Sequence, residues 1–232
     1  MTETSKIVLK LVLCGEYGVG KSSLFRRFVH DTFVERRDRA STLGFDHFEK
    51  AYQVDGRTVW LQLWDTGGLE RVASVTSSYF KHADGALLVF AYDAYDSFNA
   101  LSQHLIEVLS SAENAKVFLC GNKTDLLRSS SSSSSSTSAA GDCVAGPTDV
   151  DVETFYAENQ ISDSENMFSQ LYKVSCKSRQ NVHEMFEDIA QILYRAARPP
   201  QPNPDAFQLK PPTQSQQETK QKSSCGGSCG SN

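Results

Sequence analysis

The segment GEYGVGKS at residues 15–22 constrains the fold of this 232-residue chain more than any other feature. It follows the apolar run IVLKLVLC at 7–14, which is typical of a buried strand. It leads into SSLFRRFVH at 22–30, where apolar residues recur at helical spacing. The pattern G-x-x-x-x-G-K-S between a strand and a helix is that of a phosphate-binding loop. The sequence therefore predicts a nucleotide-binding α/β domain.

The residue types of this loop suit the binding of phosphate. Glycines let the backbone N–H groups come close to phosphate oxygens, and the dipole of the following helix favours their negative charge. Lys21 is expected to hold the β- and γ-phosphates, and Ser22 to ligate Mg²⁺. A glycine-rich turn that matches the pattern by chance is the alternative. The predicted contacts are Gly15, Glu16, Tyr17, Gly18, Val19, Gly20, Lys21, Ser22 and Ser23.

A second motif indicates which base the site accepts. Asn122, Lys123 and Asp125 belong to the segment NKTD, which follows an apolar strand-like run. The carboxylate of Asp125 can accept two hydrogen bonds from guanine, whereas adenine offers no such pair of donors. A solvated turn would use the same residues, so the assignment depends on the phosphate loop. Three later residues could complete the base pocket with backbone N–H groups: Ser175, Cys176 and Lys177.

Strands and helices alternate along the chain, which predicts a mostly parallel sheet. The dipeptide Asp55-Gly56 lies between two strand-like runs and is typical of a two-residue hairpin turn. The remaining predicted elements are strands at 48–54, 58–64, 86–92, 116–120 and 171–174, and helices at 97–110 and 182–198.

Residues 5–198 are expected to form one domain with an insertion and a tail. The insertion, at about 128–148, contains a serine-rich run and offers too little apolar surface to offset the entropy of ordering it. Residues 199–232 are rich in Pro, Gln, Ser and Lys and are expected to be a flexible tail.

Composition excludes several classes of protein. The net charge is −5, with 23 Lys and Arg against 28 Asp and Glu, which argues against nucleic acid as a partner. The longest apolar run, at 86–92, is too short to span a membrane, and the first residues do not resemble a secretory signal. A cytoplasmic protein without disulfides is therefore expected.

Between the two motifs lie residues suited to a metal and a γ-phosphate. Phosphoryl transfer needs a hydroxyl and a carboxylate near the metal and an N–H that senses the γ-phosphate, and Thr42, Asp65 and Gly68 fit these roles. The chain here resembles the Ras-like small GTPases, most of all the Rab branch, as an atypical member. The matching segments are STLGFD at 41–46, LQLWDTGG at 61–68, VTSSYFKHADG at 75–85, NKTD and SCK.

The resemblance implies a P-loop NTPase domain of the small-GTPase type, with a six-stranded sheet and helices on both faces. It implies a GDP/GTP switch that uses Mg²⁺, acts in vesicle trafficking and binds effectors, an exchange factor and a GTPase-activating protein. The metal ligands would be Ser22, Thr42 and Asp65, and Phe33 would stack on the base. A GTP-locked scaffold without useful turnover is the alternative. A metabolic P-loop kinase is disfavoured by the NKTD and SCK pairing.

Two positions depart from the family's catalytic pattern. Leu69 stands where the family has a glutamine that orients water, and leucine has neither donor nor acceptor. Tyr17 stands where the family has a small residue and is expected to crowd the γ-phosphate. Both changes predict slow hydrolysis, in a catalytic set of Lys21, Thr42, Gly68 and Leu69. The alternative is that Tyr17 points into solvent and another residue orients the water.

The first switch region is unusual as well. It carries three arginines, of which one could act near the phosphates, although solvated side chains or contacts with an acidic effector are the expectation for a charged loop. His47 stands where the Rab pattern has phenylalanine, and Phe48 follows it. The arginines are Arg36, Arg37 and Arg39, and the candidate effector face is Phe48, Trp64 and Tyr79.

The tail contains Cys225 and Cys229, which resemble the prenylation sites of Rab proteins but are separated by three residues. Lipidation of Cys229, with Cys225 as a second site, would place the protein on the cytosolic face of a membrane. A GTPase with an unmodified polar tail is the alternative.

Overall fold

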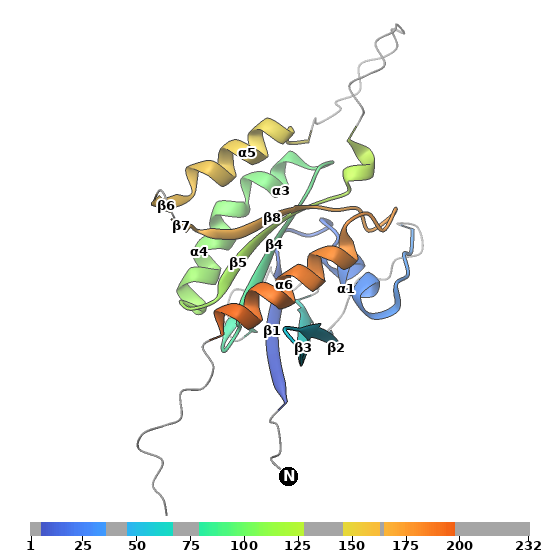
Figure 1. The fold of residues 1–232 in the computed structure, drawn as a ribbon. Coiled ribbons are helices and arrows are strands. Elements are labelled where there is room, and N and C mark those ends of the chain that lie inside the picture. Colours follow the sequence, from blue (N-terminus) through green and yellow to red (C-terminus); the bar gives the residue numbers. More distant parts are fainter. Residues whose placement is uncertain (1–5, 36–45, 67–78, 128–145, 163–164, 198–232) are drawn as a thin grey trace, which may run out of the picture. The chain divides into compact units, whose positions relative to one another are not determined.

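A six-stranded sheet forms the centre of the computed structural model (Figure 1), in the order β2-β3-β1-β4-β5-β8. The structure describes residues 6–35, 46–66, 79–127, 146–162 and 165–197. The strands of the sheet are β1 Ile7–Cys14, β2 Asp46–Val54, β3 Arg57–Asp65, β4 Gly85–Ala91, β5 Lys116–Asn122 and β8 Phe168–Lys173.

The sheet is parallel except at one edge. β2 pairs antiparallel with β3 through the tight turn at Asp55 and Gly56, both of which have positive φ, as such a hairpin requires. β1 pairs in parallel with β3 on one side and β4 on the other, and β5 and β8 continue the parallel order. The predicted mostly parallel six-stranded sheet is confirmed.

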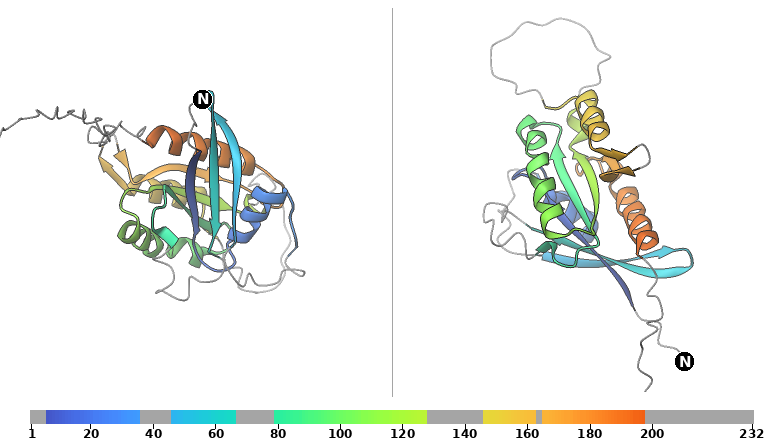
Figure 2. Two further views of the ribbon diagram at one scale, coloured as in Figure 1. Left: turned by 90° about the horizontal axis from the view of Figure 1, so that it is seen from below. Right: turned by 90° about the vertical axis from the view of Figure 1, so that its left-hand side faces the viewer.

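Helices cover both faces of the sheet, as predicted. Figure 2 shows α4 and α6 on opposite sides of it. One apolar cluster joins α1 and α6 to the sheet, and another joins α3, α4 and α5 to the opposite face. The helices are α1 Lys21–His30, α3 Tyr95–Asn99, α4 Leu101–Ser111, α5 Asp149–Glu158 and α6 Val182–Ala196.

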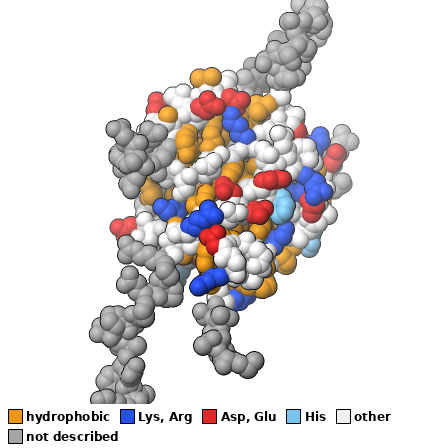
Figure 3. All heavy atoms as spheres, viewed as in Figure 1, with side chains coloured by type: hydrophobic (Ala, Val, Ile, Leu, Met, Phe, Trp, Pro, Cys, Tyr) orange, Lys and Arg blue, Asp and Glu red, His pale blue; other side chains and the backbone are white. Residues whose placement is uncertain are grey.

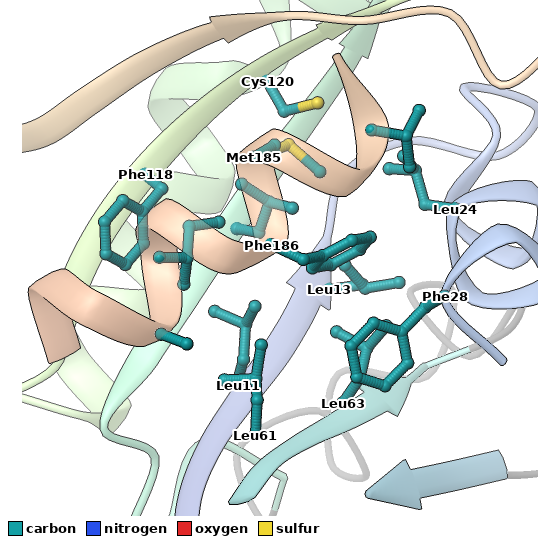
Figure 4. Packing of buried hydrophobic residues seen from close by; sticks show 14 of the residues in the cluster. Leu11, Leu13, Leu24, Phe28, Leu61, Leu63, Phe118, Cys120, Met185 and Phe186 are labelled. Carbon is teal, nitrogen blue, oxygen red and sulfur yellow. The ribbon is translucent and has the colours of Figure 1, made fainter. Parts of the chain in front are cut away.

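The core beneath α6 is close-packed (Figure 4). Leu11 and Leu63 reach it from neighbouring strands, because alternate residues of a strand point to the same face. The rings of Phe28 on α1 and Phe186 on α6 meet edge to face, with centroids 4.8 Å apart. Each such buried side chain contributes about 1.5–3 kcal/mol relative to exposure. This core fixes α1, and with it the loop before α1, against the sheet.

The helices differ from the sequence-based expectation in two places. The helix predicted at 97–110 is divided into α3 and α4 at Ala100. Helix α5 was not predicted, because its apolar face is only one turn long: Val152, Phe155 and Tyr156 pack against the core, whereas Val150 is exposed. It is followed by a two-stranded sheet of β6 Gln160–Ser162 and β7 Glu165–Asn166.

The predicted insertion ends earlier than expected. Gly146–Thr148 belong to the packed domain: a Cβ on Gly146 would lie 1.8 Å from the carbonyl oxygen of Tyr92, and Pro147 is buried. Thr148 caps α5 in a capping box with Asp151. The rest of the insertion and the tail at 199–232 lie outside the described residues.

The face that carries α6 has acidic and basic side chains interspersed among the described residues (Figure 3). No helix in the described part of the chain is long and apolar enough to cross a membrane.

Candidate nucleotide-binding site

The predicted nucleotide-binding segments meet at one edge of the sheet. The phosphate loop follows β1, the NKTD segment begins at the last residue of β5, and Ser175 follows β8 by two residues. Because these strands are parallel, their carboxyl ends lie together, which is where ligands of open α/β sheets bind.

Close packing explains two glycines of the phosphate loop. Gly15 has φ 136°, and a Cβ there would lie 2.1 Å from the carbonyl oxygen of Val89. Gly20 has φ 106°, and a Cβ there would lie 2.3 Å from Nδ2 of Asn122. A side chain at either position would displace the loop from β4 or from the NKTD segment.

Lys21 folds back over the loop that it ends. Its buried ammonium donates hydrogen bonds of 2.5 Å to the carbonyl oxygen of Gly15 and 2.9 Å to that of Glu16. Lys21 begins α1, whose first turn contains no acidic residue and whose N-cap, Gly20, has no side chain. The charge and the helix dipole at this point both favour an anion.

Asn122 connects the two halves of the site. Its Nδ2 donates 2.9 Å to the carbonyl oxygen of Val19 in the phosphate loop. Its Oδ1 accepts hydrogen bonds from the N–H groups of Lys123 at 2.8 Å and Cys176 at 3.3 Å. Asn122 therefore holds together the three loops that sequence reasoning assigned to one ligand.

Asp125 is exposed and held by a serine. Ser175 Oγ donates 2.6 Å to Asp125 Oδ1 and accepts 3.1 Å from the N–H of Ser178. An ionised carboxylate has about four acceptor sites, so Asp125 can still receive the two donors of guanine. Beside it, Lys123 Nζ contacts both carboxylate oxygens of Asp93, at 2.8 and 2.9 Å.

Arg27 is a residue of the site that sequence reasoning missed. Its side chain, 9% exposed, donates from Nε to the carbonyl oxygen of Cys176 at 2.7 Å and from Nη2 to that of Lys177 at 3.1 Å. A third donor, Nη1, reaches the carbonyl oxygen of Asp31 at 2.7 Å. Arg27 thus fastens the SCK loop to α1. Nothing in its sequence context indicates contacts made about 150 residues away.

Two of the three predicted magnesium ligands lie in the described part of the chain. Ser22 is in the first turn of α1, and Asp65, 2% exposed, ends β3 beside Leu13 of β1. A hydroxyl and a carboxylate suit Mg²⁺, which is usually held by one or two protein oxygens together with substrate phosphates. The donor set fits the metal that the sequence predicts.

Of the other predicted site residues, Phe33 and Tyr17 lie in the described part of the chain. Phe33 is half-buried and packs against the core, and Tyr17 is 62% exposed, which agrees with the alternative in which its ring points into solvent. The others lie outside the described residues: Thr42, Gly68, Leu69, Arg36, Arg37, Arg39, Cys225 and Cys229.

The candidate effector face contains an aromatic platform on β2 and β3. His47 stacks on Trp64 with centroids 4.8 Å apart, and Lys10 Nζ lies 4.6 Å from the Trp64 ring centroid. Tyr79 is half-buried and packs with Trp64 against the same apolar cluster.

The prediction of one face that includes Phe48 is wrong. Phe48 is exposed but points to the opposite side of the sheet, because it pairs with Leu63 rather than Trp64. Its ring lies 6.4 Å from that of Phe28 on α1.

Cys120 lies in β5 beneath the site. Burial raises the pKa of its thiol, so it stays neutral and unreactive at neutral pH. Cys14, Cys120 and Cys176 are buried thiols that form no disulfide.

Comparison with known proteins finds one family. The model of the Ras family matches residues 10–195. The GTP-binding protein ypt1 of Schizosaccharomyces pombe is 42% identical over 121 residues, which make up 52% of this chain and 59% of ypt1. The Ras-related protein RABD2a of Arabidopsis thaliana is 32% identical over 194 residues, 83% of this chain and 88% of RABD2a. The human Ras-related protein Rab-4B is 40% identical over 127 residues, 54% of this chain and 59% of Rab-4B. These matches confirm the predicted resemblance to Ras-like small GTPases, most like Rab.

Proposed function

The chain belongs to the Ras family, and we propose that it is a Rab-type switch that binds GDP and GTP and acts in vesicle trafficking. The observation that carries the proposal is the contact of Asn122 with Val19 and Cys176, which joins a phosphate-binding loop to a base-binding loop. The similarity to a GTP-binding protein and to Ras-related Rab proteins supports it.

In this proposal the nucleotide spans the three loops. Lys21 and the loop N–H groups bind the phosphates, Asp125 binds the guanine edge, and Phe33 stacks on the base. Lys123, together with backbone N–H groups of the SCK loop, completes the base pocket. Arg27 holds the SCK loop against α1 through its hydrogen bonds to the carbonyl oxygens of Cys176 and Lys177.

Magnesium is part of the proposal. Ser22, Asp65 and Thr42 would hold it, and it would neutralise charge on the β- and γ-phosphates. The γ-phosphate and its metal would then fix Thr42 and the N–H of Gly68, so that effectors recognise the GTP form.

Hydrolysis of GTP is proposed to be slow, because Leu69 cannot orient the attacking water. The alternative function, a GTP-locked module that only recruits effectors, is favoured by the same residue. The rate of a single turnover separates the two. Effectors are proposed to contact the face of Trp64 and Tyr79, and attachment to a membrane is proposed through lipids on Cys229 and Cys225.

The direct test is the nucleotide that copurifies with the protein. Heat or acid release from purified protein, followed by chromatography, is expected to yield GDP or GTP in near-equimolar amount. Release of adenine nucleotide, or failure of added GDP to bind, would contradict the proposal. The GDP-to-GTP ratio also distinguishes a cycling switch from a GTP-locked module.

A further inference from the structure

A histidine interrupts the apolar stripe by which α4 packs on the sheet. The buried face of this helix consists of Leu101, His104, Leu105 and Val108. His104 is 5% exposed among these apolar neighbours. Burying an imidazole without a polar partner is unfavourable. The role of His104 therefore depends on which polar group its ring contacts.

The partner is a residue of the phosphate loop. His104 Nε2 lies 3.1 Å from Glu16 Oε1, and because a carboxylate can only accept, Nε2 carries the proton of this hydrogen bond. The other ring nitrogen, Nδ1, lies 3.5 Å from Glu107 Oε2 on the same helix but makes no hydrogen bond in the described part of the chain. The contact with Glu16 is therefore the main polar anchor of the ring.

Glu16 is also tied to the lysine of the loop. Its carbonyl oxygen accepts the 2.9 Å hydrogen bond from Lys21 Nζ, and the preceding Gly15 is packed against β4. Contacts thus run from α4 through the Glu16 side chain to its backbone, and from there to the ammonium expected to bind phosphate. The hydrogen bond to the Glu16 side chain therefore restrains the residue whose carbonyl oxygen orients Lys21.

We propose that His104 is a positioning residue for nucleotide binding, which fixes the phosphate loop through its hydrogen bond to Glu16. This inference rests on the proposed binding of guanine nucleotide. It assigns to the buried face of α4 a role in the site beyond packing. It also explains a polar side chain at a position where the neighbouring stripe is apolar.

The test is the dissociation rate of a fluorescent GDP analogue from the full chain in the presence of Mg²⁺. His104→Leu removes the donor, Glu16→Ala removes the acceptor, and each is expected to accelerate dissociation about tenfold. Because both remove the same contact, the double variant is expected to be no faster than either single variant. His104→Gln, whose amide can donate from a position near that of Nε2, is expected to stay within about twofold of the parent.

Leu105→Ala is the matched structural control, because it makes a cavity in the same stripe but keeps the His104 donor and the Glu16 acceptor. It is expected to lower the free energy of unfolding and to leave GDP dissociation within about twofold of the parent. The inference is overturned if Leu105→Ala accelerates dissociation as much as His104→Leu, or if the effects of the two single variants multiply. It is also overturned if His104→Gln is as fast as His104→Leu.

Glu16 provides a second test should His104→Leu fail to fold. Its side chain is 44% exposed, so Glu16→Ala is expected to leave the fold intact. Faster dissociation from Glu16→Ala than from the parent supports the inference, and a parental rate contradicts it. A parent that binds no GDP would overturn the proposed function itself, an outcome distinct from all of these.

Discussion

The side-chain amide of Asn122, at the end of β5, donates a buried hydrogen bond of 2.9 Å to the carbonyl oxygen of Val19 in the phosphate loop. Its oxygen accepts from the N–H of Cys176 at 3.3 Å. One side chain therefore sets the separation between the loop expected to bind phosphates and the loops expected to bind the base. The separation of these loops is therefore set by hydrogen bonds within the protein.

Asn122→Ala is expected to accelerate GDP dissociation about tenfold to hundredfold. The change removes the donor to the Val19 carbonyl and the acceptor of the Cys176 N–H, and the loss of a buried hydrogen-bond partner costs about 1–3 kcal/mol. Asn159→Ala is the control, since Asn159 Nδ2 also donates to a backbone carbonyl, that of Phe155 at the end of α5, at 2.7 Å. Stopped-flow release of a fluorescent GDP analogue measures the rate. Equal acceleration by the two variants would argue that Asn122 acts only on general stability.

Hydrolysis is expected to rise when the two departures from the family's pattern are reversed together. Leu69→Gln restores a group that can orient water, and Tyr17→Gly restores the small residue that the family has in the phosphate loop. The double variant is expected to release phosphate at least about tenfold faster in a single turnover, which is about 1.4 kcal/mol off the barrier. Since Tyr17 is 62% exposed, Leu69→Gln is expected to account for most of the gain. A parent that already hydrolyses GTP as fast as the double variant would contradict this reading.

The stability of the domain is expected to depend on pH through Asp149 at the start of α5. The ammonium of Lys173, 2.7 Å away, holds the pKa of this carboxyl below its usual range, and the hydroxyl of Tyr92 donates to the same oxygen at 3.2 Å. A lowered folded pKa gives stability that is complete above the unfolded value of about 4 and is lost as the pH falls through the folded value.

Asp149→Asn is therefore expected to lower the free energy of unfolding at pH 7, by less than about 1 kcal/mol because the pair is partly exposed. The difference in the free energy of unfolding between the variant and the parent should become smaller below about pH 4. Urea unfolding across this range measures it, with Glu158→Gln at the other end of α5 as the control. A difference that stays constant down to pH 3 would rule out the ion pair as its source.

Membrane attachment is expected to require the cysteines of the tail. Mass spectrometry of protein from eukaryotic cells should show a prenyl adduct on Cys229 or Cys225 that is absent from Cys225→Ser/Cys229→Ser. Fractionation of the same cells should move the variant from the membrane to the supernatant. An unmodified tail in the parent, with unchanged partitioning of the variant, would instead support the reading of an unmodified polar tail.

Candidate site residues that belong to a contiguous motif were predictable from the sequence. Those whose contacts are with residues far away in the chain were not. The phosphate loop and its flanking strand and helix could be read directly, because glycine spacing and hydrophobic periodicity are local signals. Arg27 and His104 gave no such signal, since each meets its partner only when the sheet brings separate segments together. Helix α5 was missed because its core-facing residues, Val152, Phe155 and Tyr156, span a single turn, which is too short a pattern to identify a helix.

Competition for the nucleotide site tests the central claim most directly. The proposed pocket recognises guanine through Asp125, which Ser175 holds at 2.6 Å, and adenine cannot supply the paired donors that this carboxylate needs. Unlabelled GTP and GDP are expected to displace a fluorescent GDP analogue from the purified full chain, while ATP at a hundredfold higher concentration does not. Asp125→Asn is expected to shift the preference toward xanthine nucleotides, whose base carries an acceptor where guanine carries a donor. Displacement by ATP and GTP at equal concentrations would contradict the assignment of this protein as a guanine-nucleotide switch.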